Sequence, residues 1–290
     1  MNFLNFLSFR KFKTYFIKFK IRTNLDIFHA IILGIVEGLT EFLPVSSTGH
    51  MILTAQLLGL EHDNNDVLKC FEVAIQLGSI LAVAALFFKR LSRDFSLLIK
   101  LALGFIPTGL IGLLLYKHIK ELFSPNVVAY ALIAGGVIFI IIELFIKRKA
   151  GAQISTDEPS NDEISKISYK NALIIGLAQS LAMIPGTSRS GATIVAGILC
   201  GLSRTAAAAF SFLLALPTMF AATFYDIFKN REIFAQNIDN IFVFLLGGAV
   251  AFCVAFIVLK AFLNFLAKFS YISFGIYRIL LGAVFLIFVL

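Results

Sequence analysis

Tryptophan is absent from this 290-residue chain, charged residues make up only 14% of it, and cysteine occurs three times. A soluble globular domain carries about 25% charged residues, so the composition excludes an ordinary soluble protein. Cys70, Cys200 and Cys253 lie in or beside apolar stretches without metal-like or redox-like spacing, which favours small buried side chains over a metal or redox site. Without tryptophan, any aromatic belt at a membrane interface must consist of tyrosine and phenylalanine.

What the chain has instead is a series of long apolar runs and a mean hydropathy of +0.91. Each run is about as long as the 17–25 residues that cross a bilayer as a helix. The sequence therefore predicts an all-α polytopic membrane protein. The six runs are Phe71–Phe88, Leu97–Tyr116, Val127–Ile146, Ala206–Phe228, Ile241–Leu263 and Ile272–Leu290.

The net charge of +8 comes from basic residues that lie mostly at the ends of these runs, which favours the positive-inside pattern over nucleic-acid binding. Residues 1–26 are basic and lack both an uninterrupted apolar core and a small-residue cleavage site, which argues against a cleaved signal peptide. This segment reads as an amphipathic stretch on a membrane surface, with a disordered basic tail as the alternative. If the loop at 89–100 is cytoplasmic, most other basic ends share its side, but the N-terminal segment then falls outside, and this conflict stays open.

Two halves of the chain match each other in order. A polar linker at 148–170 separates a first repeat, 27–147, from a second, 171–290. The matches are GIVEGL with GLAQSL, PVSSTG with PGTSRS, FEVAIQLGSILA with FSFLLALPTMFA, and YALIAGGVIF with YRILLGAVFL. Each half holds one interrupted apolar segment, 27–60 or 172–201, which predicts a re-entrant helix–loop–helix, followed by three spans. Three crossings per half is an odd number, so we expect the repeats to be inverted, with a site where the two interruptions meet.

The first interruption follows two acids, Glu37 and Glu41, which share one helix face at i, i+4. Two carboxylates so close repel each other unless a proton or a cation lies between them. A hard divalent ion, Mg²⁺ or Ca²⁺, is the natural occupant. The alternative is a pair of protonated or snorkelling glutamates.

Pro44 ends the first arm, and three hydroxyl side chains, Ser46, Ser47 and Thr48, precede the next apolar run. One hydroxyl would cap a helix, but three exceed that need, and a helix N-terminus suits a phosphate. His50 lies one turn after Ser47, where an imidazole could activate a hydroxyl nucleophile. A satisfied core histidine is the alternative.

The second interruption reads PGTSRSGATI and centres on Arg189, whose planar fork suits a phosphate group. An arginine at this depth needs an anionic partner, and a structural ion pair with Glu37 or Glu41 is the alternative to phosphate binding. A cation, an arginine, helix N-termini and a hydroxyl with a base are together what phosphoryl transfer requires. Their depth implies a substrate with a lipid tail and a phosphate head. The hydroxyl side chains at this second interruption are Thr187, Ser188, Ser190 and Thr193.

EGLTEFLPVSSTGH and PGTSRSGAT resemble the two signature motifs of the bacterial undecaprenyl-diphosphate phosphatases, also called bacitracin-resistance proteins. The resemblance covers about residues 27–290. It implies hydrolysis of undecaprenyl diphosphate to undecaprenyl phosphate and inorganic phosphate, which recycles the carrier lipid for cell-wall synthesis and confers bacitracin resistance. It also implies a multi-pass protein of the cytoplasmic (inner) membrane with a site opening to the periplasmic face. The expected partners are the lipid substrate and membrane lipids, with no nucleic acid and with homodimer formation left open.

The resemblance also implies roles for single residues. Glu41, Ser47, His50 and Arg189 would be catalytic, with Ser47 or His50 as the nucleophile. Glu37 and Glu41 would hold the divalent metal. Ser46, Thr48, Ser188, Ser190 and Thr193 would bind the substrate.

Transport is the main competing function, since inverted repeats with broken helices also build transporters. A lipid-phosphate flippase would need Arg189 and the hydroxyls but no close contact between Ser47 and His50. An intramembrane protease is weakly supported, because the chain has no paired aspartates or HExxH motif and a protease would not explain Arg189.

Overall fold

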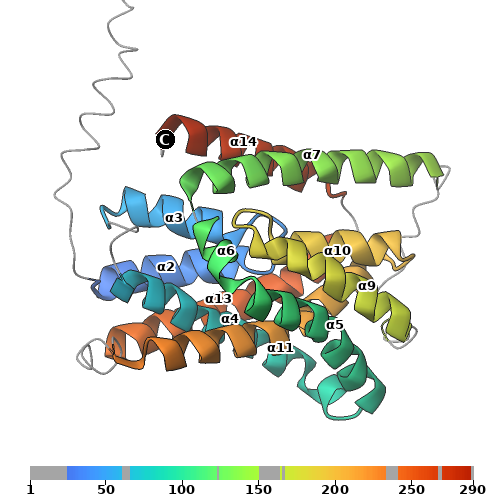
Figure 1. Ribbon diagram of the computed structural model, residues 1–290, viewed down its shortest axis with the longest axis horizontal. Coiled ribbons are helices and arrows are strands. Elements are labelled where there is room, and N and C mark those ends of the chain that lie inside the picture. Colours follow the sequence, from blue (N-terminus) through green and yellow to red (C-terminus); the bar gives the residue numbers. More distant parts are fainter. Residues whose placement is uncertain are drawn as a thin grey trace, which may run out of the picture.

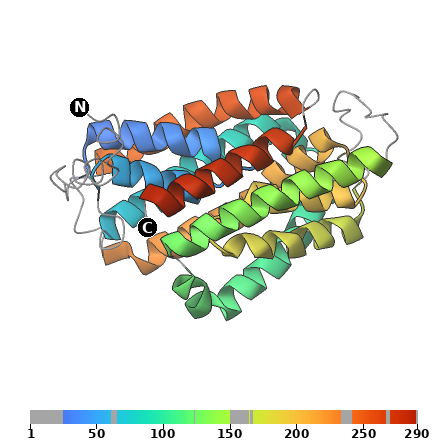
Figure 2. The same cartoon turned by 90° about the horizontal axis from the view of Figure 1, so that it is seen from above.

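The computed structural model of the 290-residue chain describes residues 25–60, 66–122, 124–149, 164, 167–232, 241–266 and 270–288, and all regular elements in those ranges are helices. The predicted all-α membrane fold is thereby confirmed. The predicted N-terminal segment falls almost wholly outside the described residues. Figure 1 shows the helices stacked in layers with their axes largely horizontal, and Figure 2 shows the same bundle from above.

Five helices in the described part of the chain are long and apolar enough to span a membrane. Asp94 caps α5 by accepting from the Leu97 N–H, and Ser203 caps α11 by accepting from the Ala206 N–H. The sixth predicted span is a shorter helix, α14 (Ile272–Phe288). The five are α4 (Asp66–Leu91), α5 (Phe95–Leu114), α7 (Pro125–Lys149), α11 (Arg204–Lys229) and α13 (Ile241–Leu266); a short helix, α6 (Tyr116–Glu121), follows α5.

Two pairs of short helices form the two segments that the sequence predicts to be interrupted. The first pair is α2 (Ile27–Thr40) and α3 (Ser47–Leu57); the second is α9 (Tyr169–Gln179), extended by the 3₁₀ turn η2 (Ser180–Met183), and α10 (Arg189–Leu199). No helix in either pair exceeds 14 residues, so none of them spans a bilayer alone. The pairs enter from opposite ends of the bundle, and their loops meet in the middle (Figures 1 and 2). We call residues 41–50 the first tip and residues 184–193 the second tip; each comprises a loop and the start of the helix that follows it.

Glycines set the contacts of each pair with the other half of the chain. A Cβ added at Gly34 of α2 would lie 2.6 Å from the carbonyl oxygen of Gly247 in α13. A Cβ at Gly176 of α9, which occupies the matching position in GLAQSL, would overlap the backbone of Gly104 in α5. Small residues let helix backbones approach closely in a bilayer, where packing drives association. The reciprocal packing of α2 on α13 and of α9 on α5 is the pattern that inverted repeats would give, and the repeat itself stays a prediction.

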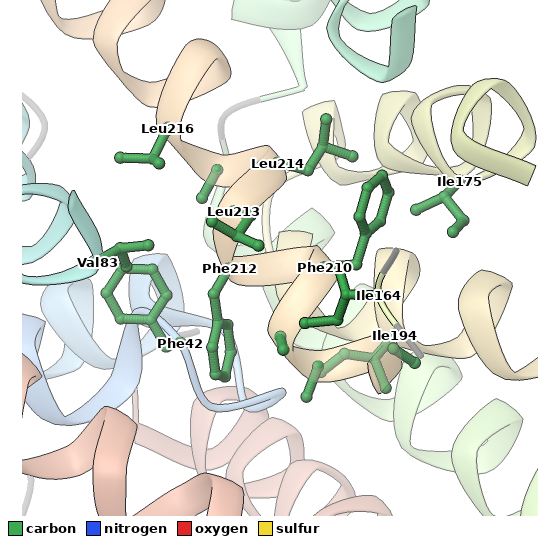
Figure 3. Close-up of a cluster of buried hydrophobic side chains, with 14 of the residues drawn as sticks. Phe42, Val83, Ile164, Ile175, Ile194, Phe210, Phe212, Leu213, Leu214 and Leu216 are labelled. Carbon is green, nitrogen blue, oxygen red and sulfur yellow. The ribbon is translucent and has the colours of Figure 1, made fainter. Parts of the chain in front are cut away.

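α11 forms the centre of the bundle, with 67% of its apolar window buried. Its Phe212 packs edge-to-face on Phe42 from the first tip, with ring centroids 5.4 Å apart, and Figure 3 shows these two rings beside Val83. Such aromatic pairs contribute about 0.5–1.5 kcal/mol beyond their burial. The main hydrophobic core therefore extends to the first tip and packs against it.

The predicted aqueous linker is partly an element of this core. Ile164 and Ile167 are buried, with 5% and 1% of their surface exposed, in the same cluster as Ile194 and Phe210. Apolar side chains gain more by packing on α10 and α11 than by staying in water. The prediction of an aqueous linker depended on the many polar residues of the segment, and it did not identify these two isoleucines as buried.

Candidate active site

The loops at the two tips share one backbone conformation. Ser46 and Ser188, the residues before α3 and α10, have φ of 71° and 72°, which is unusual for residues other than glycine. Each serine Oγ accepts from the N–H of the glycine three residues later, Gly49 or Gly191. Conformations of this kind cost about 1–3 kcal/mol and persist where the surroundings enforce them, often at functional sites.

Three of the predicted catalytic side chains converge between the tips. Ser47 Oγ donates to Glu41 Oε2 at 2.6 Å, and Arg189 Nη2 donates to Glu41 Oε1 at 3.1 Å. Arg189 also donates through Nη1 to the carbonyl oxygen of Ser211 and lies over the Phe42 ring. The two charged side chains are 8% and 12% exposed, so the pair lies in a nearly dry environment. A carboxylate, a hydroxyl and a guanidinium from opposite ends of the bundle thus form one cluster.

The hydroxyls of the second tip tie it to its neighbours. Ser190 Oγ donates to the carbonyl oxygen of Leu43 in the first tip and lies 3.1 Å from Ser188 Oγ. Thr193 Oγ1 donates to the carbonyl of Arg189 and lies 2.6 Å from Ser211 Oγ. In this structure these predicted substrate-binding hydroxyls hold the loop itself. Thr48, in the first turn of α3, is half-buried.

His50 lies near the cluster but is held away from Ser47. Its Nδ1 is 2.8 Å from the Ser46 carbonyl oxygen, and its Nε2 is 2.7 Å from the hydroxyl of Tyr277 in α14. A carbonyl accepts only, so Nδ1 carries the proton and Nε2 accepts from Tyr277. The expected Ser47–His50 hydrogen bond is therefore replaced by the Ser47–Glu41 bond, because both ring nitrogens have other partners.

Glu37 is the remaining predicted metal ligand, and only 1% of its surface is exposed. Its Oε1 has no hydrogen-bond partner among the described residues. No group of three His, Cys, Asp or Glu side chains in the described ranges is arranged to hold a metal ion by itself. Mg²⁺, however, is commonly held by one or two carboxylates together with waters and substrate phosphates, and the open oxygen of Glu37 beside Glu41 fits that donor set.

Sequence reasoning missed two side chains of α14. Arg278 is fully buried and donates to carbonyl oxygens of both tips, and Tyr277 bonds to His50. A lone arginine inside the apolar run YRILLGAVFL was a signal, since a charge at membrane depth is costly without partners. The partners are main-chain carbonyls, which no sequence motif reveals.

Comparisons with known proteins show the family to which the chain is similar. A family profile described as bacitracin resistance protein BacA matches residues 30–284. The chain is 62% identical over 266 residues to the undecaprenyl-diphosphatase of Campylobacter fetus, covering 92% of this chain and 100% of that protein. It is 64% identical over 268 residues to that of Campylobacter hominis, with the same coverage. It is 56% identical to that of Wolinella succinogenes, covering 90% of this chain and 98% of that protein.

Proposed function

This chain belongs to the bacitracin resistance protein BacA family, and on that premise we propose that it hydrolyses undecaprenyl diphosphate to undecaprenyl phosphate and inorganic phosphate. It is a multi-pass membrane hydrolase that regenerates a lipid carrier for cell-wall synthesis and contributes to bacitracin resistance. The observation that carries the proposal is the short bond between Ser47 and Glu41 with Arg189 on the same carboxylate.

Ser47 is the nucleophile and Glu41 is its base. Glu41 takes the Ser47 proton as Oγ attacks the terminal phosphorus. The bond from that phosphorus to the bridging oxygen breaks, and undecaprenyl phosphate leaves with the electron pair. Water then attacks the phosphorus of the phosphoserine, and the bond from phosphorus to Ser47 Oγ breaks. Glu41 returns its proton to Oγ, and inorganic phosphate leaves with the protons of the water. His50 is hydrogen-bonded to Tyr277 instead of Ser47, and it does not act as the base in this step.

The diphosphate is bound by Arg189 and by the two helix N-termini. The first turns of α3 and α10 offer N–H groups and partial positive charge to an anion. Arg189 turns part of its fork from Glu41 to the phosphate oxygens as the substrate enters. Four hydroxyls near these N-termini would exchange their present hydrogen bonds for bonds to phosphate, namely those of Ser46, Ser188, Ser190 and Thr193. The half-buried Thr48 would add a fifth.

Glu37 and Glu41 are the side chains that would hold a divalent metal beside the substrate. Mg²⁺ or Ca²⁺ would neutralise charge that develops on the phosphate oxygens. The support is the buried Oε1 of Glu37, which has no partner in the described part of the chain, and the i, i+4 spacing of the two acids. The protein's own contribution is to bring the carboxylate of Glu41 and the guanidinium of Arg189 together in one buried cluster.

The protein resides in the bacterial inner membrane, with its site open to the periplasmic face. The support is the set of five apolar helices in the described part of the chain and the match to the BacA family. Homodimer formation stays a prediction.

Phosphate release by purified protein tests the proposal. In detergent, with a short isoprenyl diphosphate and Mg²⁺, wild-type protein should release phosphate, whereas Ser47→Ala should bind substrate and release about 10³-fold less. Ser92→Ala is the matched control, since Ser92 is exposed and bonds only to a carbonyl at the end of α4. Binding without release by wild-type protein would establish a carrier instead, and full activity of Ser47→Ala would remove Ser47 as the nucleophile.

A further inference from the structure

Arg278 is the largest side chain in the described residues that is completely buried. It comes from α14, and its four hydrogen bonds all go to main-chain carbonyl oxygens. Nη1 donates to Pro44 at 3.3 Å and Nη2 donates to Gly186 at 3.0 Å. The other bonds run to Leu132 and Ala131 of α7. One guanidinium therefore joins the first tip, the second tip and α7.

The two tip carbonyls occupy equivalent places. Pro44 lies two residues before Ser46, and Gly186 lies two residues before Ser188, the two serines with matching positive φ. Each carbonyl belongs to the turn that aims a helix N-terminus and its first side chain, Ser47 on one tip and Arg189 on the other. The separation of these carbonyls is therefore coupled to the separation of the nucleophile from the guanidinium that binds the diphosphate.

The surroundings of Arg278 are shaped to its planar fork. A Cβ added at Gly135 of α7 would overlap Arg278 Nη2, and a Cβ at Gly191 would lie 3.3 Å from Nη1. Phe139 lies against the guanidinium face at 5.4 Å. A lysine would keep the charge, but its point-like ammonium cannot reach carbonyls on three separate segments in the same plane.

We propose that Arg278 is a positioning residue for hydrolysis, which fixes the distance between the two tips without touching the substrate. The inference rests on the proposed function. Buried carbonyls without partners are costly, so loss of the bridge lets the tips separate or twist to find other donors. Displacement of reacting groups by about 1 Å can lower the rate about 10²-fold, while binding of the lipid and its phosphates depends less on that distance.

Two substitutions test this from opposite sides. Arg278→Lys removes the fork, and Gly135→Ala keeps the arginine but displaces it. Both should lower kcat about 10²-fold per folded molecule, with KM within about threefold of wild type. Because they act on one contact, the double variant should lose little more than either single variant.

Matched controls separate positioning from general destabilisation. Arg204→Lys alters another largely buried arginine, which is paired with Glu143 away from the tips. Gly112→Ala adds a methyl group that meets only Met183. Both controls should keep wild-type kcat per folded molecule, measured on monodisperse protein. A rise in KM without a fall in kcat would make Arg278 a substrate ligand, and unchanged kcat would make it only structural; either result overturns the proposal.

The assay also distinguishes this inference from the proposed function. If wild-type protein releases no phosphate, the function itself fails. If wild-type protein is active and both Arg278→Lys and Gly135→Ala retain its kcat, only the positioning role fails. Should Arg278→Lys not be recovered as folded protein, Gly135→Ala decides alone, because it leaves every polar group of the bridge in the chain.

Discussion

Glu41→Gln is the substitution that most directly tests the cluster between the tips. It keeps the shape of the side chain and removes its charge. In the structure Oε2 accepts from Ser47 and Oε1 accepts from Arg189. An amide has one acceptor and one donor end, so it can serve only one of these two donors and turns its NH₂ group against the other.

The structure indicates how much stability and how much catalytic rate the Glu41→Gln variant should lose. Glu41 and Arg189 are 8% and 12% exposed, and removing one partner of a buried ion pair costs about 3–5 kcal/mol of stability. Loss of a general base lowers the rate by about 10²–10⁴-fold. We therefore expect a lower melting temperature and a kcat reduced by at least about 10²-fold.

The assay is phosphate release in detergent together with thermal unfolding, and the chain supplies its own control. Glu143 and Arg204 form a second buried ion pair, between α7 and α11 and away from the tips. Glu143→Gln should lose comparable stability and keep its kcat per folded molecule. The reasoning is refuted if Glu41→Gln keeps kcat within about threefold of wild type. It is also refuted if Glu143→Gln lowers kcat as much as Glu41→Gln does.

Three other substitutions probe the remaining parts of the site. Arg189→Lys should raise KM for the diphosphate about tenfold or more, since charge-assisted fork bonds are lost; a wild-type KM would exclude the arginine from substrate binding. Glu37→Gln should raise the Mg²⁺ concentration for half-maximal activity about tenfold, because one ligand charge is lost; an unchanged Mg²⁺ titration would exclude Glu37 as a ligand. Tyr277→Phe should lower the free energy of unfolding by about 1 kcal/mol through loss of the bond to His50, with the exposed Tyr130→Phe as control; equal losses of stability in the two variants would show that the bond contributes nothing.

Much of the architecture could be predicted from the sequence, because its strongest signals are local. Apolar runs of spanning length predicted the long helices. Pro44, followed by three hydroxyls, marked the end of one short helix and the start of the next. The match of the second tip to the first placed Arg189 opposite the acids, and the structure brings it to Glu41.

The rest depends on contacts between distant segments that carry no local pattern. His50 was paired with Ser47 because they are one turn apart, but the ring is held by Tyr277, which lies 227 residues further along the chain. Arg278 binds carbonyl oxygens, and every residue has one, so its partners leave no trace in the sequence. Ile164 and Ile167 are buried, but they belong to a segment whose mostly polar composition predicted a linker exposed to water.

The bridge made by Arg278 has a consequence for synthesis of the protein. Ribosomes deliver a chain from its N-terminus, and both signature motifs emerge well before α14 does. A nascent chain that still lacks α14 already carries its nucleophile, base and phosphate-binding arginine, but the distance between the two tips is not yet fixed by Arg278. On the proposed role of Arg278, the full rate of hydrolysis is therefore reached only after α14 has packed against both tips.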